Sequence, residues 1–136
     1  MKELACDVLV IGAGPAGLAA AYEAHRTGAA SVLIIERNDE AGGILPQCIH
    51  SGFGLRVFGT DLTGPEYACR WIDRARGEGV GILDHSMVLE VKPSGAVVAN
   101  PRDGLISVAS RATVLCMGCR ERPRGALAIP GARPAG

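Results

Sequence analysis

The sequence predicts an α/β fold built on a parallel sheet, and three observations support this prediction. A continuous apolar run ends at Ile11, a glycine-rich loop follows at once, and an alanine-rich stretch without breakers leads to a second apolar run that ends at Ile35. Apolar runs rich in β-branched residues are typical of strands covered on both faces, and strands that alternate with helices form parallel sheets with right-handed crossovers. We therefore expect a doubly wound, Rossmann-type arrangement.

The bulk composition fits one globular domain. The chain has 136 residues, of which 48% are hydrophobic, and its 14 basic and 14 acidic residues cancel to a formal net charge of zero. This balance gives no electrostatic basis for binding nucleic acid. No stretch reaches the ~20 consecutive apolar residues of a membrane span, and the N-terminus lacks the features of a signal peptide. We expect neither a nucleic-acid partner nor a membrane span.

The first half of the chain contains two strands, two helices and a long loop. We expect strands at residues 7–11 and 31–35, with a helix between them that begins near Pro15 and stops at Gly28. Proline is tolerated in the first helical turn, and glycine commonly follows a helix end. Residues 38–64 carry many glycines and prolines and little periodicity, which is typical of a loop over a ligand. A second helix then begins at Gly64, with Thr63 as its N-cap, and ends near Gly77 or Gly79.

The second half is predicted to be mostly β-structure. Short apolar runs separated by Pro-Ser-Gly and Pro-Arg-Asp-Gly turns indicate a small antiparallel meander inserted into the fold. Its strands are expected at residues 80–83, 87–91, 96–99 and 105–108. Residues 112–117 are expected to return to the parallel sheet as a further buried strand.

The loop after the first strand has the chemistry of a dinucleotide-binding motif, G-x-G-x-x-G. Gly12 permits the tight turn out of the strand, Gly14 lets the backbone approach a pyrophosphate, and Gly17 lets helix and strand pack closely. Pro15 and Ala16 complete the loop at the helix N-terminus. The preceding strand, the following helix and an acidic residue at the end of the second strand supply the context that a lone motif lacks.

That acidic residue is Glu36. A carboxylate at this position accepts hydrogen bonds from both hydroxyls of an adenosine ribose and repels a 2′-phosphate, which disfavours NADP. The alternative is a surface carboxylate at a strand end. The motif alone leaves NAD and FAD equally possible, because both carry the same adenosine diphosphate half.

The residues after Glu36 resemble a flavoprotein pattern, E-x5-G-G. Together with GGILPQCIHSGFG (42–54), LTGPEY (62–67) and CRERPRGALAIPGARPAG (119–136), they make the chain similar to the pyridine nucleotide-disulfide oxidoreductase superfamily. The resemblance is greatest to the NAD(FAD)-dependent dehydrogenase branch, whose members are found with glycerol-3-phosphate, opine, sarcosine or proline dehydrogenases and hydrogen cyanide synthase. It implies FAD as cofactor.

The same resemblance implies further flavin contacts. Arg37, Gly42, Gly43, Ile44 and Gln47 would belong to the cofactor site, with Cys48 and His50 near the flavin ring or ribityl chain. Val88 would contact adenine through its backbone. Gly118 would be the retained glycine of a second flavin-contacting segment, in which this chain has Cys-Met-Gly where the family has Ala-Thr-Gly. The resemblance assigns no catalytic residue.

The five cysteines suit reduced thiols in a cytoplasmic protein. Cys116 and Cys119 form a C-x-x-C, which is compatible with a redox pair or half of a metal site, but no second C-x-x-C or His pair accompanies it. We therefore expect structural cysteines and no metal. No cysteine follows Cys48 at short spacing, so the redox-active disulfide of glutathione-reductase-like members is not expected.

The expected domain is the N-terminal portion of an FAD-binding domain, over residues 1–136. The family's closing FAD segment and a second glycine-rich loop for NAD are not found within it, so we expect the domain to be incomplete at its C-terminus. The expected function is electron transfer between NAD(P)H, held by a domain outside this chain, and flavin, within an assembly of dehydrogenase subunits. The alternatives are a domain that binds NAD instead of FAD, and a non-catalytic flavin-binding fragment or assembly subunit.

Overall fold

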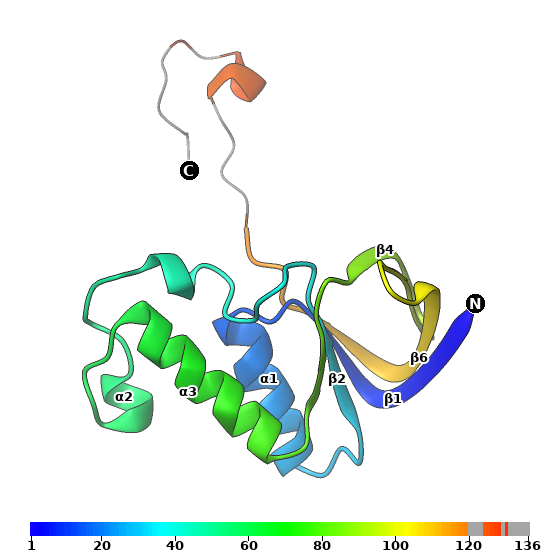
Figure 1. Cartoon of the computed structure of the whole chain (residues 1–136), viewed down its shortest axis with the longest axis horizontal. Helices are drawn as coiled ribbons and strands as arrows, with labels where there is room; N and C mark the ends of the chain where they lie inside the picture. The colour runs from blue at the N-terminus through cyan, green and yellow to red at the C-terminus, as the bar shows by residue number, and fades with distance from the viewer. Residues whose placement is uncertain (120–123, 129, 131–136) are drawn as a thin grey trace.

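The computed structural model of the chain describes residues 1–119, 124–128 and 130 (Figure 1). The described residues form one sheet of six strands in the order β3-β2-β1-β6-β5-β4. The strands are β1 (Lys2–Ile11), β2 (Val32–Ile35), β3 (Gly81–Leu83), β4 (Met87–Lys92), β5 (Gly95–Asn100) and β6 (Gly104–Leu115). The helices are α1 (Pro15–Arg26), α2 (Leu55–Phe58) and α3 (Gly64–Gly77), with 3-10 turns η1 (Leu45–Gln47) and η2 (Arg124–Leu127). The predicted α/β class is confirmed.

The sheet has a parallel part and an antiparallel part. β3, β2, β1 and β6 are parallel, whereas β4, β5 and the first half of β6 form an antiparallel meander. β1 lies between β2 and β6, which makes it the central parallel strand that its apolar run predicts.

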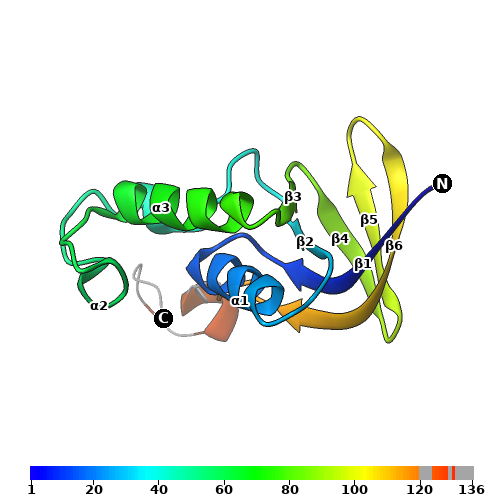
Figure 2. The ribbon, with the colours of Figure 1, turned by 90° about the horizontal axis from the view of Figure 1, so that it is seen from below.

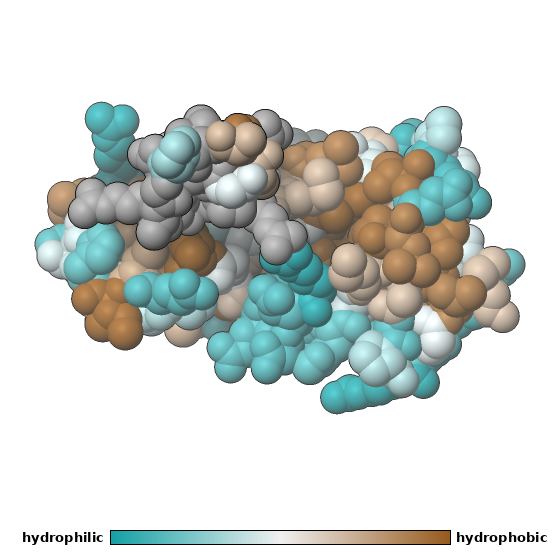
Figure 3. Space-filling model, turned by 90° about the horizontal axis from the view of Figure 1, so that it is seen from above, coloured by the Kyte–Doolittle hydropathy of each residue, from teal (hydrophilic) through white to brown (hydrophobic). Residues whose placement is uncertain are grey.

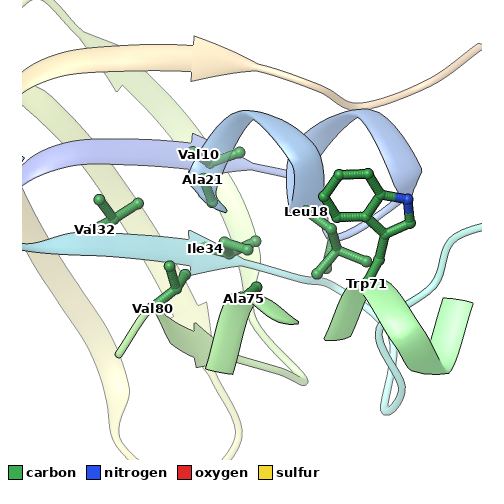
Figure 4. Packing of buried hydrophobic residues seen from close by; sticks show 9 residues of the cluster. Val10, Leu18, Ala21, Val32, Ile34, Trp71, Ala75 and Val80 are labelled. Atoms are coloured by element: carbon green, nitrogen blue, oxygen red, sulfur yellow. The ribbon is translucent and has the colours of Figure 1, made fainter. Parts of the chain in front are cut away.

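Helices α1 and α3 lie side by side over one face of the parallel strands (Figure 2). Their apolar stripes bury a cluster that includes Leu18, Trp71 and Ala75 against Val10 and Ile34 of the sheet (Figure 4). Leu18 and Ile34 are fully buried, and burying one such side chain stabilises a fold by about 1.5–3 kcal/mol.

On their other face, the parallel strands pack against apolar side chains of the meander. Alternate β1 residues Leu9 and Ile11 point to this side, where they pack with Val98, Ile106 and Val108. The outer side of the meander carries exposed apolar residues, which gather at one end of the molecule when it is seen from above (Figure 3). They include Met87, Leu89 and Leu105.

The termini of α3 follow from its sequence. The Thr63 hydroxyl accepts from the Glu66 N–H, and the Glu66 carboxylate accepts from the Thr63 N–H at 2.8 Å, which is a complete capping box. The bonds that the Glu66 carboxylate accepts, chiefly from the Thr63 N–H and then from the Thr63 hydroxyl, hold the pKa of Glu66 below its ordinary value. The predicted N-cap and the end at Gly77 are confirmed.

Two strand predictions were wrong. β3, expected as the first meander strand, pairs in parallel with β2, because α3 carries the chain back to the same end of the sheet. The strands expected at 105–108 and 112–117 are one strand, β6, which continues through polar residues 110 and 111 because β1 pairs along nearly its whole length. In addition, β1 begins at Lys2, and the loop at 38–64 contains η1 and α2.

No helix among the described residues is both long and apolar enough to cross a membrane.

Candidate dinucleotide-binding site

The glycine loop lies where the carboxyl ends of β1, β2 and β6 meet. The Gly12 N–H donates to the Ile35 carbonyl at 2.8 Å, and the Cys116 N–H donates to the Ile11 carbonyl at 2.8 Å. After β1 the chain adds β2 and β3 on one side of β1, and β6 is later added on the opposite side. Open α/β sheets bind ligands at such a switch point, beyond the carboxyl ends of their strands.

Packing within the protein requires glycine at two positions of the loop. Gly12 has φ +103°, and a Cβ built on it would lie 2.3 Å from the Cys116 carbonyl oxygen. A Cβ on Gly17 would lie 1.8 Å from the Gly12 carbonyl oxygen. Both contacts involve backbone atoms that a small side-chain movement cannot relieve. The roles predicted for these two glycines, a tight turn and close helix packing, agree with this geometry.

Packing does not require glycine at position 14. Gly14 has φ −72°, and a Cβ built on it would meet only the Gly43 Cα, at an ordinary contact distance of 3.9 Å. It is the N-cap of α1, and no side chain caps the N–H groups of the first turn. Those groups include Ala16 and Gly17, and they lack partners within the helix. The space next to Gly14 and these N–H groups, which a side chain at position 14 would fill, therefore remains available to a ligand. We call this space the cradle.

Glu36 lies directly after β2, against the glycine loop. Its carboxylate accepts hydrogen bonds from the Ala13 N–H at 2.8 Å and the Asn38 N–H at 2.9 Å. The residue is only 5% exposed, so it is not a surface carboxylate. A carboxylate has about four lone-pair sites, so two bonds leave acceptor capacity for the hydroxyls of a ligand.

The Gly42–Gly43 segment packs directly on the glycine loop. The Gly42 N–H donates to the Ala13 carbonyl at 2.8 Å. A Cβ on Gly43 would lie 2.9 Å from the Gly14 Cα, and Gly43 has φ +61°. Segments nearly 30 positions apart in sequence thus form one cradle. Ile44 is the N-cap of η1 and Gln47 is its last residue, and both side chains are exposed.

The remaining predicted residues lie at different distances from this cradle. Gly118 is exposed with φ +71°, two positions beyond Cys116, whose carbonyl contacts Gly12. Arg37 is exposed directly after Glu36. Val88 lies in the edge strand β4, with its side chain packed on the second core cluster. Ser86, two positions before Val88, donates its N–H to the Glu36 carbonyl at 2.8 Å.

Sequence reasoning missed three backbone contributors. The Ala13 and Asn38 N–H groups hold the Glu36 carboxylate, and the Cys116 carbonyl occupies the space where a Cβ on Gly12 would lie. The only sequence signal for the carbonyl contact is the glycine itself, because backbone groups leave no residue-type signature.

The two cysteines of the C-x-x-C are not bonded to each other, and the loop histidine contacts a neighbouring backbone carbonyl. Cys116 and Cys119 are both free, and burial raises the pKa of the Cys116 thiol, whereas Cys119 is exposed. His50 is exposed, and its Nδ1 lies 2.9 Å from the Ser51 carbonyl oxygen. Residues 120–123, 129 and 131–136 of the family-like segment 119–136 lie outside the described residues.

The chain matches a known family and several curated proteins. The model of the family described as FAD dependent oxidoreductase matches residues 7–53, which contain the glycine loop, Glu36 and the Gly42–Gly43 segment. The alpha chain of sarcosine oxidase from Corynebacterium sp. (strain P-1) is 36% identical over 86% of this chain and 13% of its own length. One of the subunits of opine oxidase from Rhizobium meliloti (strain 1021) is 29% identical over 86% of this chain and 25% of its own length. The chain thus spans a quarter or less of these relatives.

Solved structures share the fold. L-proline dehydrogenase from P. horikoshii superposes with a TM-score of 0.75 at 23% identity, over 88% of this chain and 24% of that one. Thioredoxin reductase from Streptococcus pyogenes MGAS5005 superposes with a TM-score of 0.69 at 26% identity, over 87% of this chain and 37% of that one. We conclude that the chain is similar to the FAD-dependent oxidoreductases, both in its glycine-loop region and over most of its fold.

Proposed function

We propose that residues 1–136 are the FAD-binding part of a flavoprotein oxidoreductase that passes hydride between NAD(P)H and flavin, as one subunit of a dehydrogenase assembly. The observation that carries this proposal is the cradle formed by Gly14, Gly43 and Glu36. Packing explains why Gly12 and Gly17 lack side chains, but it gives no reason for glycine at 14. A pyrophosphate at that point supplies one.

The residues of the cradle fit FAD. The Ala16 and Gly17 N–H groups and the positive end of the α1 dipole would hold the pyrophosphate. Glu36 would accept from the adenosine ribose hydroxyls, and its negative charge would disfavour a 2′-phosphate. Residues 42–44, Gln47 and Gly118 would line the flavin side, with Arg37 and Val88 on the adenine side. When bound, FAD supplies hydride and electron transfer, while the protein supplies orientation and exclusion of water.

The wider activity is inferred from relatives. The matching chains of sarcosine oxidase, hydrogen cyanide synthase and opine oxidase are all named as subunits, which supports an assembly with further subunits. NAD(P)H would be held by a domain outside residues 1–136. The five free cysteines support a cytoplasmic location.

Two measurements test the proposal. FAD is titrated into the 136-residue chain by flavin fluorescence, with NAD as competitor and Gly14→Val as the variant that fills the cradle. Because the domain is expected to be incomplete, we expect weak FAD binding that Gly14→Val abolishes, and equal binding by the variant would contradict the site. In the assembly isolated through this chain from its host, NADH should bleach the flavin under anaerobic conditions. Bound flavin that NADH does not bleach would instead identify a non-catalytic flavin-binding protein.

A further inference from the structure

Gly64, the first residue of α3, lies beneath the carbonyl groups of the loop at 42–48. A Cβ built on it would lie 2.3 Å from the Leu45 carbonyl oxygen, 2.6 Å from the Cys48 carbonyl oxygen and 2.7 Å from the Cys48 Cβ. Its own N–H donates to the Cys48 carbonyl at 3.0 Å. The loop therefore packs directly against the backbone of the first residue of α3, with no side chain between them.

Helix geometry does not explain a glycine here. Gly64 does not have a left-handed backbone, since its φ is not among the positive values of the chain. Glycine is less favourable than alanine in a helix, so the helix itself gives no reason for glycine. Gly64 is also buried, so solvent exposure does not account for it. The close approach of the loop is the remaining physical reason.

The contact continues from α3 to the dinucleotide cradle. Leu45, which is 3% exposed, donates its N–H to the Gly42 carbonyl at 3.2 Å. Gly42 lies close to Ala68, one turn along α3, since a Cβ on Gly42 would be 3.2 Å from the Ala68 Cβ. The Gly42 N–H in turn donates to the Ala13 carbonyl of the glycine loop. The loop at 42–48 therefore lies between the first two turns of α3 and the glycine motif, and it contacts both.

We propose that Gly64 is a positioning residue for the cofactor site: by lacking a side chain, it sets the height of residues 42–48 over the glycine loop and so the width of the cradle between Gly14 and Gly43. It acts through Leu45 and Cys48, without touching the ligand. The inference rests on the proposed FAD site, and it adds a determinant that lies outside the glycine motif and Glu36.

The direct test compares two alanine substitutions in the same helix. Gly64→Ala introduces the backbone clash, whereas Gly77→Ala, at the other end of α3, meets nothing within 4 Å. We expect Gly64→Ala to raise the FAD dissociation constant by at least about tenfold, the equivalent of one lost hydrogen bond. The visible spectrum of its bound flavin should also shift toward that of free FAD. Gly77→Ala should leave the dissociation constant and the spectrum unchanged.

The unfolding midpoint in urea distinguishes a specific effect of Gly64→Ala on the cofactor site from a general loss of stability. Wild-type affinity and spectrum in folded Gly64→Ala would overturn the inference. So would an equal loss of affinity in Gly77→Ala. If wild type itself binds no FAD, the proposed function fails, which is a different outcome from binding that Gly64→Ala leaves intact.

A second measurement needs no variant and applies if Gly64→Ala does not fold. Hydrogen exchange of the wild-type chain is followed with and without FAD. Because the loop would be clamped between ligand and helix, FAD should slow exchange over residues 45–48 and at the Gly64 amide, but not around Gly77. Unchanged exchange at Gly64 with FAD bound would contradict the inference.

Discussion

The Glu36 carboxylate accepts a hydrogen bond from the Ala13 N–H at 2.8 Å, so the end of β2 holds the glycine loop that follows β1. The residue expected to bind ribose therefore also shapes the pyrophosphate loop. Any change at Glu36 acts on both the fold and the ligand.

Glu36→Ala should weaken FAD binding by about 1–3 kcal/mol, because charge-assisted hydrogen bonds to the ribose are lost. It should also lower the free energy of unfolding, because the Ala13 and Asn38 N–H groups lose their acceptor. Fluorescence titration and urea denaturation measure the two effects. Glu36→Gln keeps one acceptor oxygen and should fall between wild type and Glu36→Ala. An unchanged dissociation constant in Glu36→Ala would remove Glu36 from the ligand site.

Gly14→Ala and Gly17→Ala should separate binding from stability. At Gly14 the new methyl group meets only the Gly43 Cα, so the free energy of unfolding should change by no more than about 1 kcal/mol while FAD binding is lost. At Gly17 the methyl group would overlap the Gly12 carbonyl, so the protein should be strongly destabilised. Thermal unfolding and FAD titration of both variants give the comparison. A Gly14→Ala protein that retains full FAD affinity would show that the cradle holds no phosphate.

Cys119 should react faster than Cys116 with iodoacetamide at pH 8. Burial raises the pKa of the Cys116 thiol, and the thiolate is the reactive form. Mass spectrometry of the alkylated chain measures both rates. The double variant Cys116→Ser, Cys119→Ser should still bind flavin, and flavin reduction by NADH in the native assembly should be unchanged. A lost reductive half-reaction would instead establish a redox pair.

The capping box of α3 should make stability pH-dependent. The folded-state pKa of Glu66 lies below its unfolded value of about 4.3. Its contribution is therefore fully present above the unfolded pKa and is lost as the pH falls through the folded value. Glu66→Gln removes the titration while keeping an acceptor for the Thr63 N–H. In urea melts the stability gap between wild type and variant should be constant at neutral pH and close in acid. A gap that widens in acid would contradict the assignment.

Trp71 should tolerate phenylalanine far better than alanine. It is 7% exposed and packs edge-on against Tyr22 and Phe58, but its buried Nε1 has no hydrogen-bond partner among the described residues. Phenylalanine removes that unpaired donor and keeps most of the ring, whereas alanine should cost about 3–5 kcal/mol. Urea denaturation gives both values. Equal losses would indicate that the indole nitrogen has a partner, such as water.

Local patterns predicted helices α1 and α3 and the tight glycine turn between β1 and α1. Pro15, the Thr63 cap and the glycine spacing each act within a few residues, so the sequence specifies them directly. Strand pairing was less accessible, because an apolar run does not specify its neighbour. For this reason β3 was assigned to the wrong part of the sheet and β6 was divided in two. The support that Gly64 gives the loop depends on backbone atoms of another segment, which residue types do not report.

The pairing of β1 with β6 has a consequence for the order of folding. Lys2 pairs with Ile106 and Ile11 pairs with Leu115. The first strand to be synthesised therefore cannot complete its pairing until β6, which is near the end of the described residues, has been synthesised. Contacts so distant in sequence form slowly, because a long stretch of chain must be ordered before they stabilise anything. During synthesis, one edge of β1 stays open while β2 already occupies the other. An open apolar strand is a site for association with other chains. Nascent forms that end before β6 should therefore be the aggregation-prone species, and the β1 amides that pair with β6 should become protected from hydrogen exchange later than those that pair with β2.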